Sequence, residues 1–162
     1  MRKDILMLSP IAVLIVSFAL LAQTDGTASF PRQFRKWAHV KSVLVGSQSN
    51  AFATEGGIHH IYANDKALEG YNSGKFPDGS VIVYDLLETK EVAGNTIEGS
   101  TRRVDVMVKQ SERYPVTGGW EFMSFSGNDQ TNGKLSAARQ ATCAGCHGNR
   151  KDHDSVFSEF RK

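Results

Sequence analysis

Two cysteines and a histidine lie close together near the end of the chain, in the order Cys143-Ala144-Gly145-Cys146-His147. Two thiols separated by two residues, with a histidine directly after the second, form the attachment pattern of a c-type haem. Each thiol can bond to one of the two vinyl groups of the haem, and the imidazole is then held beneath the iron as an axial ligand. The motif uses both cysteines of the chain. It predicts a covalently attached haem c that is held by Cys143 and Cys146, with His147 as the ligand of its iron.

Three other uses of the two thiols stay open at this point. A redox-active pair usually lies where a strand meets the start of a helix, whereas these cysteines lie at the end of a predicted helix. Zinc could be bound by Cys143, Cys146, His147 and His153, although ligands at adjacent positions fit a tetrahedron poorly. A disulfide across two intervening residues is strained and closes almost no loop. Haem is favoured because a predicted export signal places the chain in the compartment where this attachment takes place.

A second protein ligand for the iron is harder to find. Beyond the apolar N-terminal segment the chain offers only Met107, Met123, His39, His59, His60 and His153. The methionines lie in strand-like stretches, where packing in the core is their expected role. The last histidine is too close in sequence to His147 to reach across the haem, and His59 and His60 point to opposite faces of a predicted strand. We therefore expect a five-coordinate iron with one face open to a small ligand.

The N-terminal segment has the layout of a secretory signal. A basic start precedes an apolar run from Ile5 to Ala22, and polar residues follow at once. We interpret residues 1–22 as a signal peptide that is cleaved between residues 22 and 28, and residues 30–162 as the exported domain. A retained anchor is the alternative, because about 18 apolar residues can just span a bilayer. In both cases the domain is expected in the periplasm or elsewhere outside the cytoplasm.

The composition is that of an ordinary globular domain. The chain has 162 residues, of which 40% are hydrophobic and 22% are charged, and its formal net charge is +2. This balance excludes collagen-like and wholly disordered chains. The weak positive charge gives no reason to expect nucleic acid as a partner.

Short strands, followed by a helix, must position the cysteine motif. Hydrophobic alternation predicts strands over residues 43–45, 58–63, 80–88, 101–109 and 120–126. Helices are predicted over residues 66–71 and 135–147, and the second helix ends in the motif. A polar loop over residues 47–54 and a polar turn region over residues 90–100 separate the strands. The predicted class is α+β, with a mainly antiparallel sheet, short helices, and a C-terminal helix that carries the motif.

Four motifs follow one another along the exported part. They are Gly74 to Val81 before a strand, Val108 to Tyr114, the cysteine motif, and Val156-Phe157 with Phe160. This ordered set resembles the cytochrome P460 family, which includes the cytochrome c′-beta proteins. The resemblance implies a β-rich fold that commonly forms a homodimer and a five-coordinate c-type haem with His147 as its ligand. It also implies a role in nitric-oxide binding or in hydroxylamine oxidation.

Two positions decide which of these roles the resemblance favours. Hydroxylamine-oxidising members carry a lysine that is bonded to the haem and follows a G-x-F-x-D-G-x-V-x-V stretch, and Tyr84 stands at that position here. An acid of their distal pocket, on the side of the haem away from His147, falls on Asp105. Tyr84 alternates with Ile82 and Leu86, so we expect it to face the apolar interior. We expect both Tyr84 and Asp105 to contribute to the distal pocket.

Three functions fit the sequence. The first is a haem protein that binds or senses a small diatomic ligand such as nitric oxide, and the open iron face favours it. The second is an oxidoreductase acting on hydroxylamine or a related nitrogen compound, with Asp105 as the proton acceptor. The third is a six-coordinate electron carrier with a protein partner for electron transfer.

Overall fold

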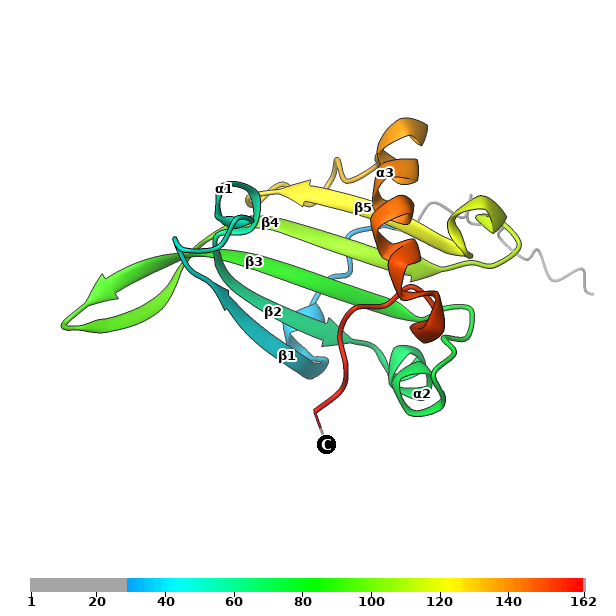
Figure 1. Ribbon diagram of the computed structural model, residues 1–162, viewed down its shortest axis with the longest axis horizontal. Helices are drawn as coiled ribbons and strands as arrows, with labels where there is room; N and C mark the ends of the chain where they lie inside the picture. Colours follow the sequence, from blue (N-terminus) through cyan, green and yellow to red (C-terminus); the bar gives the residue numbers. More distant parts are fainter. Residues whose placement is uncertain (1–28, 162) are drawn as a thin grey trace, which may run out of the picture.

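A single antiparallel sheet forms the centre of the molecule, as predicted. The computed structural model describes residues 29–161, so the segment predicted as a signal peptide lies outside the described residues. Each strand pairs with the next one along the chain, and Figure 1 shows this regular order. The strands are β1 (Ala38–Val45), β2 (Gly57–Ala63), β3 (Val81–Val92), β4 (Asn95–Lys109) and β5 (Trp120–Ser126).

Short helices surround the sheet. The α-helices are α1 (Phe52–Glu55), α2 (Asp65–Ser73) and α3 (Ala137–His147), and the 3-10 helices are η1 (Phe34–Lys36), η2 (Pro115–Thr117) and η3 (Gly148–His153). Helix α3 carries the cysteine motif and crosses one face of the sheet, with α1 and α2 toward opposite ends of the sheet (Figure 1). No helix within residues 29–161 is both long enough and apolar enough to cross a membrane.

Successive side chains of the central strands point to alternate sides of the sheet, and both sides are buried. On the first face, Ile82 and Phe122 belong to an apolar cluster that also contacts α2 and α3. On the second face, Val83 and Val106 pack with Phe34 of η1. Neighbouring residues of a strand point to opposite faces, so the alternating pattern that predicted the strands also divides the core in two.

Phe34 is expected to be essential for the second face. Its side chain is 2% exposed and makes edge-to-face contacts with Phe30 and Tyr62. Replacing Phe34 by alanine should lower the free energy of unfolding by about 3–5 kcal/mol, because the change removes buried apolar area and leaves a cavity. Urea denaturation measures the loss. The matched control is Val116→Ala, since Val116 is 93% exposed, and equal effects of the two changes would contradict this account of the core.

Two local predictions are wrong. The polar region over residues 90–100 is not a long turn, because β3 and β4 continue as a hairpin that reverses at Ala93 and Gly94, both with positive φ. The predicted loop over residues 47–54 contains the start of α1. In the C-terminal segment, Val156 is buried while Phe157 and Phe160 are exposed.

Candidate haem site

Helix α3 is attached to the sheet through one of its polar side chains. Gln140 accepts a hydrogen bond from the backbone N–H of Phe122 and donates one to the Phe122 carbonyl, at 2.9 and 2.7 Å. The side-chain amide thus satisfies both backbone groups of a residue in the edge strand β5. The helix begins at a Ser136 cap, which accepts from the N–H of Arg139. These bonds fix the position of α3, and therefore of the motif, against the first face.

The two cysteines differ in their surroundings. Cys143 packs against the apolar cluster of the first face, whereas Cys146 is exposed, and both thiols are free. Burial raises the pKa of the Cys143 thiol, and the negative charge of Asp105 contributes to this rise. Two free thiols that are three positions apart on one helix are suited to bond to the two vinyl groups of a haem.

Two of the other uses of the thiols, a zinc site and a redox-active pair, gain no support from this arrangement. Within residues 29–161, no three or more histidine, cysteine, aspartate or glutamate side chains gather where they could hold a metal ion. The cysteines lie in the second half of α3, far from the helix start that a redox-active pair usually occupies.

His147 ends α3 with its ring oriented for metal binding. Its Nδ1 lies 2.8 Å from the Ser155 carbonyl oxygen. A carbonyl can only accept, so Nδ1 carries the proton and Nε2 keeps the lone pair that a metal needs. Phe122 and Phe157 pack on the ring, with centroids at 5.1 and 5.0 Å. Burial lowers the pKa of His147, although the bond to Ser155 opposes this shift, and the neutral ring that results fits an axial ligand of haem.

Tyr84 and Asp105 lie side by side on the first face, the same face that α3 covers. They are directly opposite each other in the β3–β4 pairing. Met107 projects from the same face of β4 as Asp105 and packs against the apolar cluster that Cys143 also contacts. The sheet therefore brings both predicted pocket residues to the side of the molecule where the motif lies.

Sequence reasoning missed two further residues of this face. Arg103 donates two hydrogen bonds to the carboxylate of Glu55, at 3.0 and 2.9 Å, and one to Asp105, at 2.7 Å. Burial alone would lower the pKa of Arg103, but the two carboxylates raise it. Glu55 belongs to α1, the helix that was predicted as a loop, so no pattern in the sequence indicated its contact with residues of β3 and β4.

The hydroxyl of Tyr84 contacts polar groups, although the residue shares its face with the buried Ile82 and Leu86. The hydroxyl lies 3.0 Å from Glu55 Oε2 and also contacts His59 Nδ1. The His59 Nε2 donates to the Glu55 carbonyl, which leaves Nδ1 as an acceptor. The single proton of Tyr84 therefore has two acceptors within the protein. Burial lowers the pKa of His59, which favours this neutral form.

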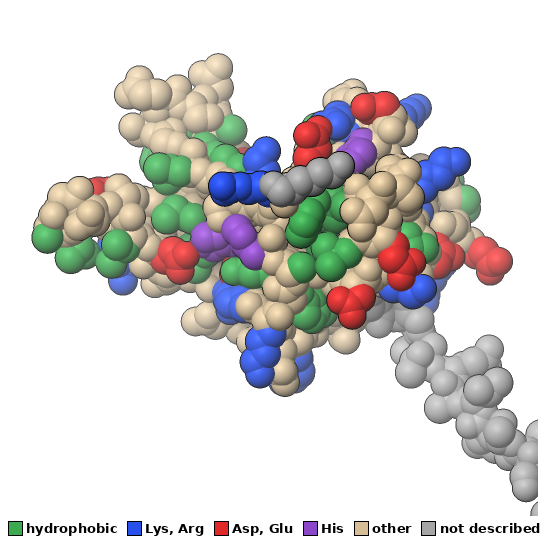
Figure 2. All heavy atoms as spheres, turned by 90° about the horizontal axis from the view of Figure 1, so that it is seen from below, with side chains coloured by type: hydrophobic (Ala, Val, Ile, Leu, Met, Phe, Trp, Pro, Cys, Tyr) green, Lys and Arg blue, Asp and Glu red, His purple; other side chains and the backbone are tan. Residues whose placement is uncertain are grey.

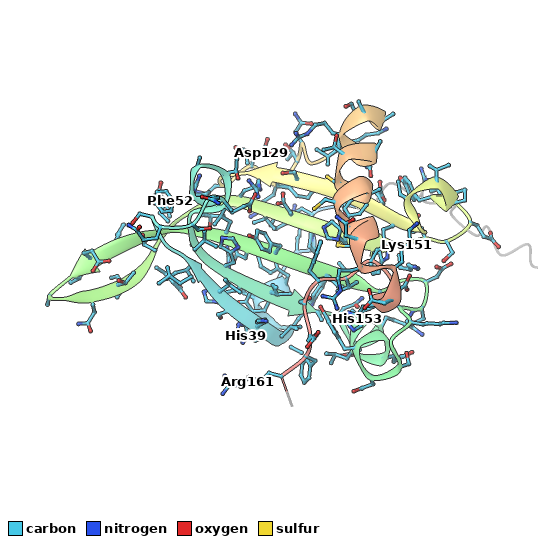
Figure 3. All side chains as sticks on the ribbon, viewed as in Figure 1. His39, Phe52, Asp129, Lys151, His153 and Arg161 are labelled. Atoms are coloured by element: carbon cyan, nitrogen blue, oxygen red, sulfur yellow. The ribbon has the colours of Figure 1, made fainter. Side chains whose placement is uncertain are left out.

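The neighbouring histidine belongs to a different surface. His60 points to the opposite face of β2, as predicted, and bonds to Ser42 and Glu98 at 2.8 and 2.6 Å. His39 joins the same group through Ser42. Histidine side chains are visible together at the β1 edge of the sheet in Figure 2. In Figure 3, His39 lies well away from Phe52 of α1, at the other end of β1.

Comparison with known proteins agrees with this arrangement. The sequence profile of the family described as Cytochrome P460 matches residues 31–158, which include every strand, α3 and the complete cysteine motif. No match to a curated protein was found. With a match over most of its length and a motif helix seated on the sheet, the chain belongs to the cytochrome P460 family.

Proposed function

We propose that this chain is an exported c-type haem protein that binds a small uncharged ligand such as nitric oxide. Cys143 and Cys146 would hold the haem, and Nε2 of His147 would ligate its iron. When bound, the haem supplies a ferrous iron that takes up the ligand. The observation that carries the proposal is the hydrogen bond from His147 Nδ1 to the Ser155 carbonyl, because it leaves Nε2 free for a metal.

The distal side supports ligand binding over electron transfer. His59 is the only histidine that β2 directs to the first face, and both of its ring nitrogens are engaged, by Glu55 and by Tyr84. Met107 packs in the apolar cluster beneath α3. As arranged, His59 has no free ring nitrogen to act as a second iron ligand, which favours a five-coordinate iron.

Hydroxylamine oxidation is the second candidate, and the position of Asp105 supports it. Asp105 lies on the sheet face that α3 covers, and its negative charge acts on both Cys143 and His147, so its carboxylate is the candidate proton acceptor for this reaction. Because Tyr84 stands where a lysine would form the crosslink, ligand binding is the preferred function.

An absorption spectrum of the ferrous protein tests the proposal. We expect a high-spin spectrum that changes when nitric oxide is added and a haem that acidified solvent does not extract. A low-spin spectrum without ligand would instead support an electron carrier. A strongly red-shifted band, together with turnover of hydroxylamine, would support the oxidase.

Tyr84 is expected to affect the lifetime of the bound ligand. Tyr84→Phe should change the rate of nitric-oxide release from ferrous iron about fivefold, because it removes the hydroxyl that holds Glu55 and His59 in place beside the predicted pocket and a typical hydrogen bond contributes about 1 kcal/mol. Haem attachment should be unaffected. Stopped-flow spectroscopy measures the rate. The matched control is Tyr71→Phe, which removes a different hydroxyl, bonded to Ser158 at 2.6 Å. If Tyr71→Phe changes the rate of nitric-oxide release and Tyr84→Phe does not, the placement of Tyr84 beside the ligand is wrong.

A further inference from the structure

A buried ion pair connects the sheet to the segment that follows the motif. Lys109, at the end of β4, is 6% exposed, and its Nζ lies 2.7 Å from Asp154 Oδ1. The same ammonium donates to the Gly118 carbonyl at 2.9 Å and lies 4.9 Å from the centre of the Trp120 ring. The ammonium of Lys109 therefore contacts a carboxylate, a carbonyl and an aromatic ring of the protein. None of these three groups was assigned to the haem site above.

Asp154 is held at two further points. Its Oδ2 accepts from the backbone N–H of Phe76 at 2.9 Å, and its carbonyl accepts from the indole N–H of Trp120 at 2.8 Å. These partners come from the loop before β3 and from the start of β5, while Lys109 ends β4. Three separate parts of the sheet region therefore determine where Asp154 lies.

The backbone at this point adopts a conformation that its residues do not favour. Asp154 and Ser155 have φ values of 48° and 66°, in the left-handed region that glycine usually occupies. Two such residues in succession persist only where their surroundings impose the conformation. The resulting turn brings the Ser155 carbonyl to 2.8 Å from His147 Nδ1, although η3 separates the two residues in sequence.

We propose that the Lys109–Asp154 pair is a positioning device for the axial histidine. The ion pair holds the turn at Asp154 and Ser155 in its left-handed conformation. This turn orients the Ser155 carbonyl, which accepts the hydrogen bond from His147 Nδ1. A stronger bond at Nδ1 makes the ring a better electron donor to iron, which stabilises the ferric state and lowers the reduction potential. The inference rests on the proposed function, because its effect is exerted on a haem iron bound to His147.

Asp154→Asn in the haem-loaded, full-length protein tests the proposal. The change removes the charge that holds Lys109 and loosens the turn. We expect the reduction potential to rise and the iron–histidine stretching frequency of the ferrous protein, measured by resonance Raman spectroscopy, to fall. Both shifts report the strength of the hydrogen bond from His147 Nδ1 to the Ser155 carbonyl. A lower free energy of unfolding does not by itself change either signal.

The matched control removes a different ion pair, in which the carboxylate is buried and the arginine is exposed. Asp85 is 1% exposed and accepts two hydrogen bonds from Arg35, at 2.7 and 2.9 Å, on the second face of the sheet. Asp85→Asn should lower stability without moving either signal. If Asp154→Asn does not fold, the double variant Lys109→Met with Asp154→Asn replaces it, because it leaves no unpaired buried charge.

The outcomes separate this inference from the proposed function. Shifts in the Asp154 variant and not in the Asp85 variant support the positioning role. Unchanged signals in a covalently loaded Asp154 variant, or equal shifts in both variants, overturn it while the proposed function stands. A wild-type protein that releases its haem to acidified solvent overturns the proposed function, and this inference with it.

Discussion

Replacement of both Cys143 and Cys146 by alanine should abolish covalent haem attachment completely. The two thiols are the only cysteines of the chain, so the double variant has no group that can form a thioether. His147 is retained in this variant, and any haem that still binds is held by the iron–histidine bond and by packing alone. Extraction with acidified solvent should therefore remove all of the haem from the variant and none from the wild type.

Single variants provide the control for this experiment. Cys143 is partly buried and Cys146 is exposed. Each single variant retains one cysteine that can form a thioether, so both single variants should keep their haem during extraction. If the wild type releases its haem as easily as the double variant, attachment through the motif is wrong. Mass spectrometry of the protein gives an independent measure, because covalent haem adds its own mass to the chain.

Removal of the predicted signal should be equally decisive. A chain that begins near Gln23 should accumulate as apoprotein, because c-type haem is attached outside the cytoplasm and the truncated chain is not exported. The haem content per protein, measured by absorbance, should fall from about one to none. The folded sheet begins beyond this segment, with β1 at Ala38, so the truncated chain should still fold.

The control is a chain in which residues 1–22 are exchanged for another export signal. This chain should regain full haem loading, which separates a defect of export from a defect of folding. Full loading of the truncated form would contradict the interpretation of this segment as an export signal. Fractionation of cells that express the natural sequence should, in addition, place the protein outside the cytoplasm.

The parts of the fold that depend on local pattern were predictable. Strand β5 has the predicted bounds, and α3 has its predicted end at His147, because alternation and helix propensity are properties of neighbouring residues. The paired position of Tyr84 and Asp105 follows from strands that were located correctly. The motif itself could be recognised because its three residues, Cys143, Cys146 and His147, lie within five positions.

The parts that depend on distant contacts were not predictable. Glu55 and Arg103 are 48 residues apart, and nothing near Glu55 in the sequence indicates that a single helical turn, α1, places it on the first face. Asp154 presents the same problem, since its partners Phe76 and Lys109 come from other elements. The hairpin was missed because the end of β3 and the start of β4 are exposed on both faces. These segments therefore lack the alternation of hydrophobic and polar residues that marks a strand with one buried face.

That hairpin divides the sheet into regions of very different local stability. The pairing of β2 with β3 ends at Leu87, and that of β4 with β5 ends at Arg103, so beyond these points β3 and β4 have only each other. The β3–β4 hairpin extends away from the rest of the sheet in Figure 1, and its apolar residues Val92 and Ile97 are 50% and 44% exposed. A two-stranded ribbon without a third strand is marginally stable in water. Its amide hydrogens should exchange with solvent through local opening, long before those of the strands beneath α3.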